Sequence, residues 1–186
     1  MSQLTIYPVI TSEDSPPLPL LHTTDPAFIA QELAQRGLEF QQWPARADLD
    51  PIAAPEQILT AYSDEIARVQ EAGLYPTVDA VSVGPDHPKR KELRQQFLSE
   101  HTHAEDEVRF FVEGKGLFCL HIDDKVYQVL CTRNDLISVP ANTPHWFDMG
   151  PEPEFTALRF FDNVEGWVPH WTESDIAGKF DRLDQL

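Results

Sequence analysis

The chain has 186 residues, of which 41% are hydrophobic, so it is long enough for one well-packed core and is not a disordered protein. Its formal net charge is −17, and we expect neither nucleic acid nor an anionic membrane as a partner, because an acidic surface repels both. The same charge mildly favours a monomer. No basic leader and no apolar run of about 18 residues is seen, so we expect a cytoplasmic protein.

The pattern predicts one domain over 1–186, in three consecutive parts. Residues 1–95 mix short strands and helices, and we expect them to form an α/β segment that covers the core. Residues 96–165 are strand-rich and hold the candidate metal-binding barrel. Residues 166–186 are expected to wrap the outside, with Trp167 and Trp171 packing down.

Two amphipathic helices are predicted in the first part. One begins after Asp25, a good N-cap that is followed by proline, and ends at Gly37, with Phe28 on its buried stripe. The other runs from about 55 to 72 as one long helix, because its apolar residues recur with helical spacing. A short basic helix is predicted over 88–98. Strands are predicted over 3–8, 38–43 and 77–83.

From Glu107 to about Asp162 the pattern is strand throughout. Short strands separated by turn residues, about eight to twelve residues apart, are typical of a sandwich or a small barrel. The GKG triplet at 114–116 predicts a hairpin turn that splits the first run into two strands. Cys119 and Cys131 lie in such strands, and we expect two reduced core thiols in place of a disulfide framework.

Two short motifs flank this strand-rich part. The first, HTHAEDE, spaces His101, His103 and Glu107 as H-x-H-x3-E, and the second, PANTPH, ends at His145. Residues two apart on a strand face the same side, so His101 and His103 should point together. Three imidazoles and one carboxylate suit Fe, Ni, Mn, Co or Zn. We therefore predict that the two motifs meet around one divalent metal.

Two arginines are predicted to point inward beside this metal. In EVRFFV, Glu107, Arg109 and Phe111 share one face, and Arg159 is placed in the same way in ALRFF. Burying an unpaired charge is costly, so each arginine needs an anionic partner. A negatively charged, electron-rich substrate would supply one. The alternative is that Arg109 merely pairs with a carboxylate such as Glu105.

These motifs resemble those of a known family. HTHAEDE followed by Gly114 resembles the first cupin motif, and PANTPH up to His145 resembles the second. Within the cupins, the stretches F-L-x-E-H-T-H, E-V-R-F-F-V-E-G, V-P-A-N-T-P-H-W-F-D-M-G and A-L-R-F-F resemble the acireductone dioxygenases of methionine salvage. The resemblance covers the chain from about Asp79 to Trp167. It implies a mainly β, cupin-type double-stranded β-helix (jelly-roll barrel) with a few peripheral helices, mostly from the N-terminal third.

The second motif departs from the family pattern at its glycines. Asn134 stands where the turn before the strand usually has glycine, and Asn142 replaces the second glycine of the motif. Asparagine tolerates a positive φ better than most residues, so both turns should survive the change.

The resemblance also implies a reaction. His101, His103, Glu107 and His145 would bind one Fe(2+) or Ni(2+) per chain, with Co or Mn as alternatives. The substrates would be 1,2-dihydroxy-3-keto-5-methylthiopentene, an acidic enediol, and O2. The Fe form would give formate and 4-methylthio-2-oxobutanoate. The Ni form would give 3-(methylthio)propanoate, formate and carbon monoxide.

The expected substrate site has a polar and an apolar part. Arg109 and Arg159 would neutralise and orient the substrate, while Phe97, Phe147 and Trp167 would surround its methylthio tail unless they are plain core aromatics. Two other classes of function stay open. The same site could belong to another metal-dependent cupin enzyme, either an isomerase or a different dioxygenase, or the chain could be a non-catalytic cupin that binds a small ligand.

Overall fold

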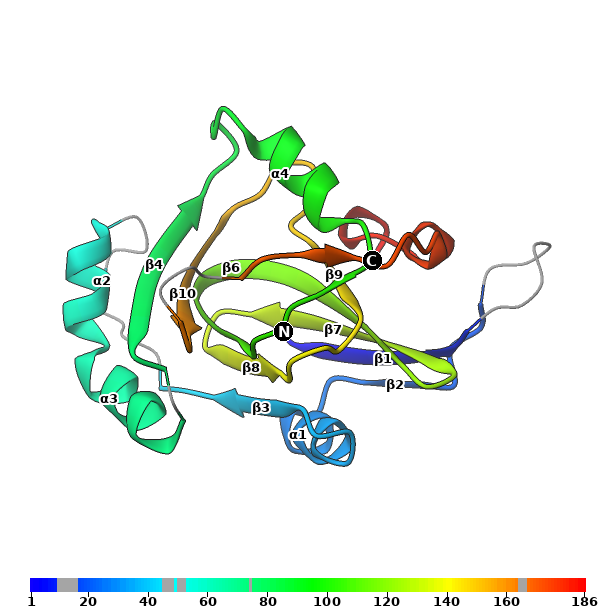
Figure 1. Cartoon of the computed structure of the whole chain (residues 1–186), viewed down its shortest axis with the longest axis horizontal. Coiled ribbons are helices and arrows are strands. Elements are labelled where there is room, and N and C mark those ends of the chain that lie inside the picture. The colour runs from blue at the N-terminus through cyan, green and yellow to red at the C-terminus, as the bar shows by residue number, and fades with distance from the viewer. Residues whose placement is uncertain (10–16, 45–48, 50–52, 74, 164–166) are drawn as a thin grey trace.

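The computed structural model describes residues 1–9, 17–44, 49, 53–73, 75–163 and 167–186 (Figure 1). The strands are β1 (Gln3–Pro8), β2 (Leu21–Thr23), β3 (Glu39–Gln42), β4 (Thr77–Val83), β5 (His101–Thr102), β6 (Glu107–Ile122), β7 (Lys125–Thr132), β8 (Asp135–Val139), β9 (His145–Asp148), β10 (Phe155–Phe161) and β11 (His170–Trp171). The helices are α1 (Pro26–Ala34), α2 (Pro55–Ala61), α3 (Ser63–Ala72) and α4 (Arg90–Phe97), followed by the 3₁₀ turns η1 (Ile176–Lys179) and η2 (Leu183–Gln185). Within these ranges, no helix combines the length and the apolarity needed to span a bilayer.

The strands form two antiparallel sheets that share β6. One sheet has the order β11-β5-β9-β6-β7-β1-β2, and in the other β10 lies between β4 and β6 while β8 lies between β6 and β3. Strands from the first part of the chain therefore extend both sheets. The predicted class, a mainly β cupin-type barrel with peripheral helices, is confirmed.

Strand β6 is continuous over 16 residues, so the hairpin predicted at 114–116 is wrong. The first half of β6 pairs with β8 and β10, and the second half pairs with β7 and β9. Gly114, with φ +76°, lies where the partners change, and the register with β10 shifts between Thr156 and Ala157. Because both halves find partners on both sides, the chain bends from one sheet into the other and does not reverse.

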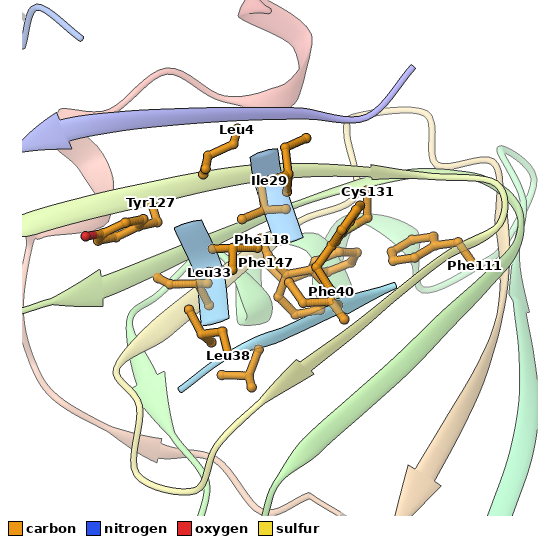
Figure 2. Close-up of a cluster of buried hydrophobic side chains, with 14 of the residues drawn as sticks. Leu4, Ile29, Leu33, Leu38, Phe40, Phe111, Phe118, Tyr127, Cys131 and Phe147 are labelled. Atoms are coloured by element: carbon orange, nitrogen blue, oxygen red, sulfur yellow. The ribbon is translucent and has the colours of Figure 1, made fainter. Parts of the chain in front are cut away.

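The barrel interior is filled by side chains from both sheets and from α1 (Figure 2). Phe118 and Phe147 pack there with ring centroids 4.8 Å apart. Ile29 and Leu33, one helical turn apart on α1, join the same cluster and are fully buried. Phe28 was expected on this stripe but is 40% exposed, because its position on the helix turns it away from the sheet.

The outer face of β6 packs under α2 and α3, which lie beside β4 and β10 (Figure 1). Val108, Phe110 and Val112 point to this side, as their alternation predicts. The single helix predicted over 55–72 is wrong, because the chain leaves helical geometry at Tyr62, with φ −105° and ψ 20°. The break lets the Tyr62 ring pack edge-on against Phe110, with centroids 5.1 Å apart.

The C-terminal segment lies against the edge of the sheet that begins with β5. Strand β11 pairs with β5, and the backbone N–H of Thr172 donates to the carbonyl oxygen of Glu100. Trp171 was expected to pack down, but it is 45% exposed because β11 is the outermost strand of its sheet. Farther on, Ile176 and Phe180 are buried against a second apolar cluster.

Candidate functional site

Neighbouring strands bring the two histidine motifs together. His101 on β5 lies directly opposite His145, the first residue of β9, and β9 also pairs with β6, which begins at Glu107. One ring nitrogen each of His101, His103 and His145 lies within 4.8 Å of the other two. All three imidazoles are buried. Three imidazoles that converge in this way could hold a metal ion.

Backbone carbonyl groups orient all three rings. The Nδ1 atoms of His101, His103 and His145 lie 2.8, 3.1 and 2.7 Å from the carbonyl oxygens of Ser99, Val168 and Thr143. A carbonyl oxygen can only accept, so each Nδ1 carries the hydrogen. In the neutral rings, each Nε2 therefore presents a lone pair to the centre of the cluster. Hydrogen bonds of this kind fix the tautomer and orientation of metal-binding histidines.

Glu107 closes the fourth side of the cluster. Its Oε2 lies 3.3 Å from Nε2 of His103 and 3.2 Å from Nε2 of His145, and its Oε1 accepts a 2.7 Å hydrogen bond from Nη2 of Arg109. Burial alone would raise the pKa of this carboxyl, but the charge of Arg109 and the contacts with both imidazoles hold the pKa well below its usual value. Glu107 is therefore a buried carboxylate anion.

The protonation of the imidazoles follows from their neighbours. Burial, together with the charge of His145, lowers the pKa of His101 to about 4. Burial also lowers the pKa of His103, but the hydrogen bond and charge of Glu107 outweigh this effect, so the pKa of His103 is raised. The Nε2 lone pairs of His103 and His145 face an oxygen of Glu107 at hydrogen-bond distance. Such a contact is favourable only when a proton or a metal ion lies between the nitrogen and the oxygen. The donor set therefore fits a divalent cation.

A cavity of about 500 Å³ opens beside the cluster. Its lining combines charged and polar side chains with aromatic ones. Its lining includes all the predicted site residues except His145. The lining residues are Thr77, Asp79, Leu93, Gln96, Phe97, His101, His103, Glu107, Arg109, Phe147, Arg159, Phe161, Asn163, Trp167 and Pro169.

The two predicted arginines differ in their surroundings. Arg109 is 8% exposed and pairs with Glu107, so the alternative partner Glu105 is not the one it uses. Its Nε atom is buried and has no hydrogen-bond partner among the described residues. The side chain of Arg159 is 30% exposed and pairs with Asp79. Both arginines border the cavity and bring a positive charge to it.

The three aromatic candidates have different environments. Phe147 belongs to the barrel core, and its ring centroid lies 4.6 Å from Cζ of Arg109. Trp167 lies over both arginines and donates from Nε1 to the carbonyl oxygen of Asp106 at 3.1 Å. Phe97 ends α4 and is partly buried. Each of them both packs and faces the cavity, so the two interpretations are not exclusive.

Two carboxylates at the site were not singled out from the sequence. Asp79 makes two hydrogen bonds with Arg159 and lines the cavity. Asp106 accepts from the backbone N–H of Ala141 at 2.8 Å and from the Tyr75 hydroxyl at 3.1 Å, and so connects the first motif to the second. The alternation of the strand at 77–83 was the available signal for Asp79, because it places a charge on a strand face.

Comparison with known proteins shows the family of this chain. The model of the ARD/ARD' family matches residues 9–169. "Acireductone dioxygenase" of Synechococcus sp. (strain RCC307) is 63% identical over 183 residues, 98% of this chain and 99% of the relative, and that of Citrobacter koseri is 55% identical over 183 residues, again 98% and 99%. A solved acireductone dioxygenase from Bacillus anthracis, described with a cadmium ion in its active centre, superposes with a TM-score of 0.77 at 29% identity, covering 92% of this chain and 98% of that one. On the family match and these relatives, the chain belongs to the ARD/ARD' family of acireductone dioxygenases.

Proposed function

We propose that this protein is a metal-dependent acireductone dioxygenase that cleaves 1,2-dihydroxy-3-keto-5-methylthiopentene with O2 in methionine salvage. The observation that carries the proposal is the meeting of three oriented imidazoles and a buried carboxylate at the end of a cavity that two arginines border. The curated relatives that match nearly the whole chain carry the name of this activity.

The proposed ligands are His101, His103, Glu107 and His145, and they would hold one Fe(2+) or Ni(2+) per chain, with Co or Mn as alternatives. In the neutral rings, the three Nε2 atoms are acceptors, and they converge with an oxygen of Glu107, which is also an acceptor. No hydrogen then lies between these lone pairs, so they repel one another. A cation resolves that repulsion, which supports the fit. The cadmium ion in the active centre of the Bacillus anthracis relative is consistent with a divalent site.

A bound divalent metal would supply Lewis-acid stabilisation of the substrate's enediolate oxygens. The protein's own part is to collect and orient a dianion. Arg109 brings a positive charge to the cavity wall, and Arg159 brings another. Phe147 and Trp167 exclude water around that guanidinium and leave an apolar surface for the methylthio tail.

The two product sets differ in how many carbon–carbon bonds break. With Fe(2+), we propose that one bond breaks and gives formate and 4-methylthio-2-oxobutanoate. With Ni(2+), we propose that two bonds break and give 3-(methylthio)propanoate, formate and carbon monoxide. Both sets contain all the atoms of the substrate and of one O2.

Oxygen uptake tests the proposal directly. The metal-free protein is loaded with Fe(2+) or Ni(2+) and mixed with the acireductone in air. We expect one O2 consumed and one formate formed per substrate with either metal, and carbon monoxide only with Ni(2+). A protein that binds the metal but takes up no O2 would belong to another class of metal-dependent cupin enzyme. A protein that binds no stoichiometric transition metal would be a non-catalytic cupin.

A further inference from the structure

Three charged residues form a row across three neighbouring strands. In the antiparallel pairing, Arg159 on β10 lies directly opposite Asp79 on β4 and directly opposite Arg109 on β6. Directly opposed residues share one face of a sheet, and all three side chains line the cavity. Two arginines side by side repel each other, so the row is stable only with a counter-charge for each.

Each arginine in the row has its own carboxylate. Arg109 pairs with Glu107, which belongs to the proposed metal site. Arg159 makes two hydrogen bonds with Asp79, from Nε to Oδ1 at 2.9 Å and from Nη2 to Oδ2 at 2.6 Å. A bidentate pair of this geometry fixes the plane of the guanidinium group. It leaves Nη1 of Arg159 for another acceptor.

Aromatic rings complete the placement of Arg159. Its Cζ lies 5.3 Å from the ring centroid of Phe161 and 5.7 Å from that of Trp167. The rings restrict the side chain from one side and Asp79 restricts it from the other. The Arg159 side chain is 30% exposed, and without these contacts it would adopt many conformations. Binding a ligand would then cost the entropy of ordering that side chain.

The formal charges around the cavity also balance. Among the described lining residues, Asp79 and Glu107 are the carboxylates and Arg109 and Arg159 are the guanidinium groups, so their charges cancel. A divalent metal then sets the charge of the site at +2, which a doubly ionised enediol neutralises. Without Asp79, the site would carry one uncompensated positive charge after the dianion binds, and the Arg159 guanidinium would lose the partner that fixes its plane.

We propose that Asp79 is a positioning residue of the substrate site, which holds the Arg159 guanidinium over the cavity and matches the charge of the site to a dianion. The inference rests on the proposed function. The pair adds little to the stability of the fold, because partly exposed ion pairs contribute about 0–1 kcal/mol. The Asp79 side chain is 44% exposed.

The experiment compares Asp79→Asn, Asp79→Glu, Arg159→Gln and the double variant D79N/R159Q. Glu113→Gln is the matched control, since Glu113 is 34% exposed and pairs at 3.4 Å with Arg133, outside the cavity lining. Each metal-loaded protein is measured for metal content, thermal midpoint, and the kcat and KM for the acireductone. A titration with the acireductone under strictly anaerobic conditions gives its Kd without turnover.

We expect D79N to raise KM and the anaerobic Kd about tenfold, with kcat changed less than about threefold and metal content unchanged. D79E keeps the carboxylate and should recover much of the loss. In the R159Q background, D79N should have no further effect, because Asp79 acts through Arg159. E113Q should behave like the parent protein.

Three results would overturn the inference: parental KM and Kd in D79N, an equal effect of D79N with and without Arg159, or a loss of metal or thermal stability that accounts for the change. If the parent protein takes up no O2, the proposed function fails, and the anaerobic titration still decides whether Asp79 governs binding of the enediol.

Discussion

His101 and His145 lie directly opposite each other on β5 and β9, so the two sequence motifs meet at adjacent positions of one sheet. Their ring centroids are 4.5 Å apart, and His103 lies within 5.2 Å of His145. The four proposed ligands lie on β5 and β9, in the loop that follows β5, and at the start of β6. We therefore expect that a proposed ligand can be replaced without unfolding the apolar core.

We predict that His103→Ala abolishes metal binding and O2 uptake while the fold survives. The ring is buried and packs beside the rings of His101, His145 and Trp167. Removing one of four ligands costs most of the affinity for a divalent ion. Elemental analysis and near-UV circular dichroism measure the two outcomes. His87→Ala, which removes a partly buried histidine elsewhere, should retain metal. Full metal occupancy in H103A would contradict the proposed ligand set.

Arg109→Ala should keep the metal but weaken substrate binding. The proposed ligand Glu107 remains, while a guanidinium group that borders the cavity is lost. Removing a charge-assisted hydrogen bond costs about 2 kcal/mol, or about a thirtyfold rise in the Kd of the acireductone under anaerobic conditions. Arg109→Lys should recover only part of this, because a lysine cannot donate to Glu107 and to a ligand in the same planar geometry. Parental turnover in R109A would make the arginine structural.

The metal-free protein should lose stability as the pH falls from 6.5 to about 4. In the folded protein, burial lowers the pKa of His101 to about 4, from an ordinary value of 6.5. Between these values the unfolded chain binds a proton that the folded chain does not, so acid favours unfolding. The shift corresponds to about 3 kcal/mol when it is fully expressed. The raised pKa of His103 acts in the opposite direction and offsets part of the loss.

Urea unfolding of the metal-free protein at pH 7, 5.5 and 4 measures this effect. His101→Gln removes the group whose pKa is lowered, so its stability should depend less on pH than that of the parent protein. A parent and variant that change in parallel with pH would show that His101 is not the cause.

The sequence predicted that the two histidine motifs meet, but it predicted neither the place of Asp79 at the cavity nor the way the barrel bends. The period of two on strands and the spacing of the motifs are local properties, and they place His101 beside His103 and Glu107 on the face of Arg109. The course of β6 at Gly114 depends on which strands pair with each half, and this is a property of the assembled sheets. When the GKG triplet is considered alone, it favours a hairpin turn as much as it favours a bend in a continuous strand.

The same limit explains Tyr62 and Asp79. Helical spacing continues through Tyr62, and only the packing of its ring against Phe110 shows why the helix breaks. Asp79 lies on a strand whose partner, β10, follows far later in the chain. Asn134 and Asn142 were expected at turns that need a positive φ, and their φ values of 79° and 62° confirm that expectation.

We predict that Asp148→Asn destabilises the protein by about 3 kcal/mol. Asp148 is 1% exposed, receives two hydrogen bonds from Arg94 of α4, and accepts from the backbone N–H groups of Gly150 and Leu183. Burial raises the pKa of this carboxyl, but those donors outweigh burial and hold the pKa below its usual value. An asparagine oxygen cannot accept all four bonds, and the guanidinium loses its counter-charge.

The control for D148N is Asp184→Asn. Asp184 also bonds to Arg94 but is 45% exposed, so its loss should cost less than about 1 kcal/mol. Urea unfolding compares the two variants. Because α4 also carries Leu93 and Phe97 of the cavity wall, D148N should in addition raise the KM for the acireductone. Equal stability losses in D148N and D184N would show that the buried network does not anchor α4.

Among the glycines that the structure describes, Gly114→Ala should be the most damaging substitution, because Gly114 combines two constraints. Its φ of +76° is unfavourable for any residue with a Cβ, and a Cβ there would lie 1.9 Å from the carbonyl oxygen of Glu154. Gly37 has the same φ of +76° with nothing within 4 Å, and Gly84 has neither constraint. We expect G84A to be nearly neutral, G37A to cost about 1 kcal/mol and G114A to cost more than about 3 kcal/mol. Thermal unfolding of the three variants separates backbone strain from steric overlap. If G114A and G37A had the same thermal midpoint, the close approach of β6 to the start of β10 would not explain the need for glycine at position 114.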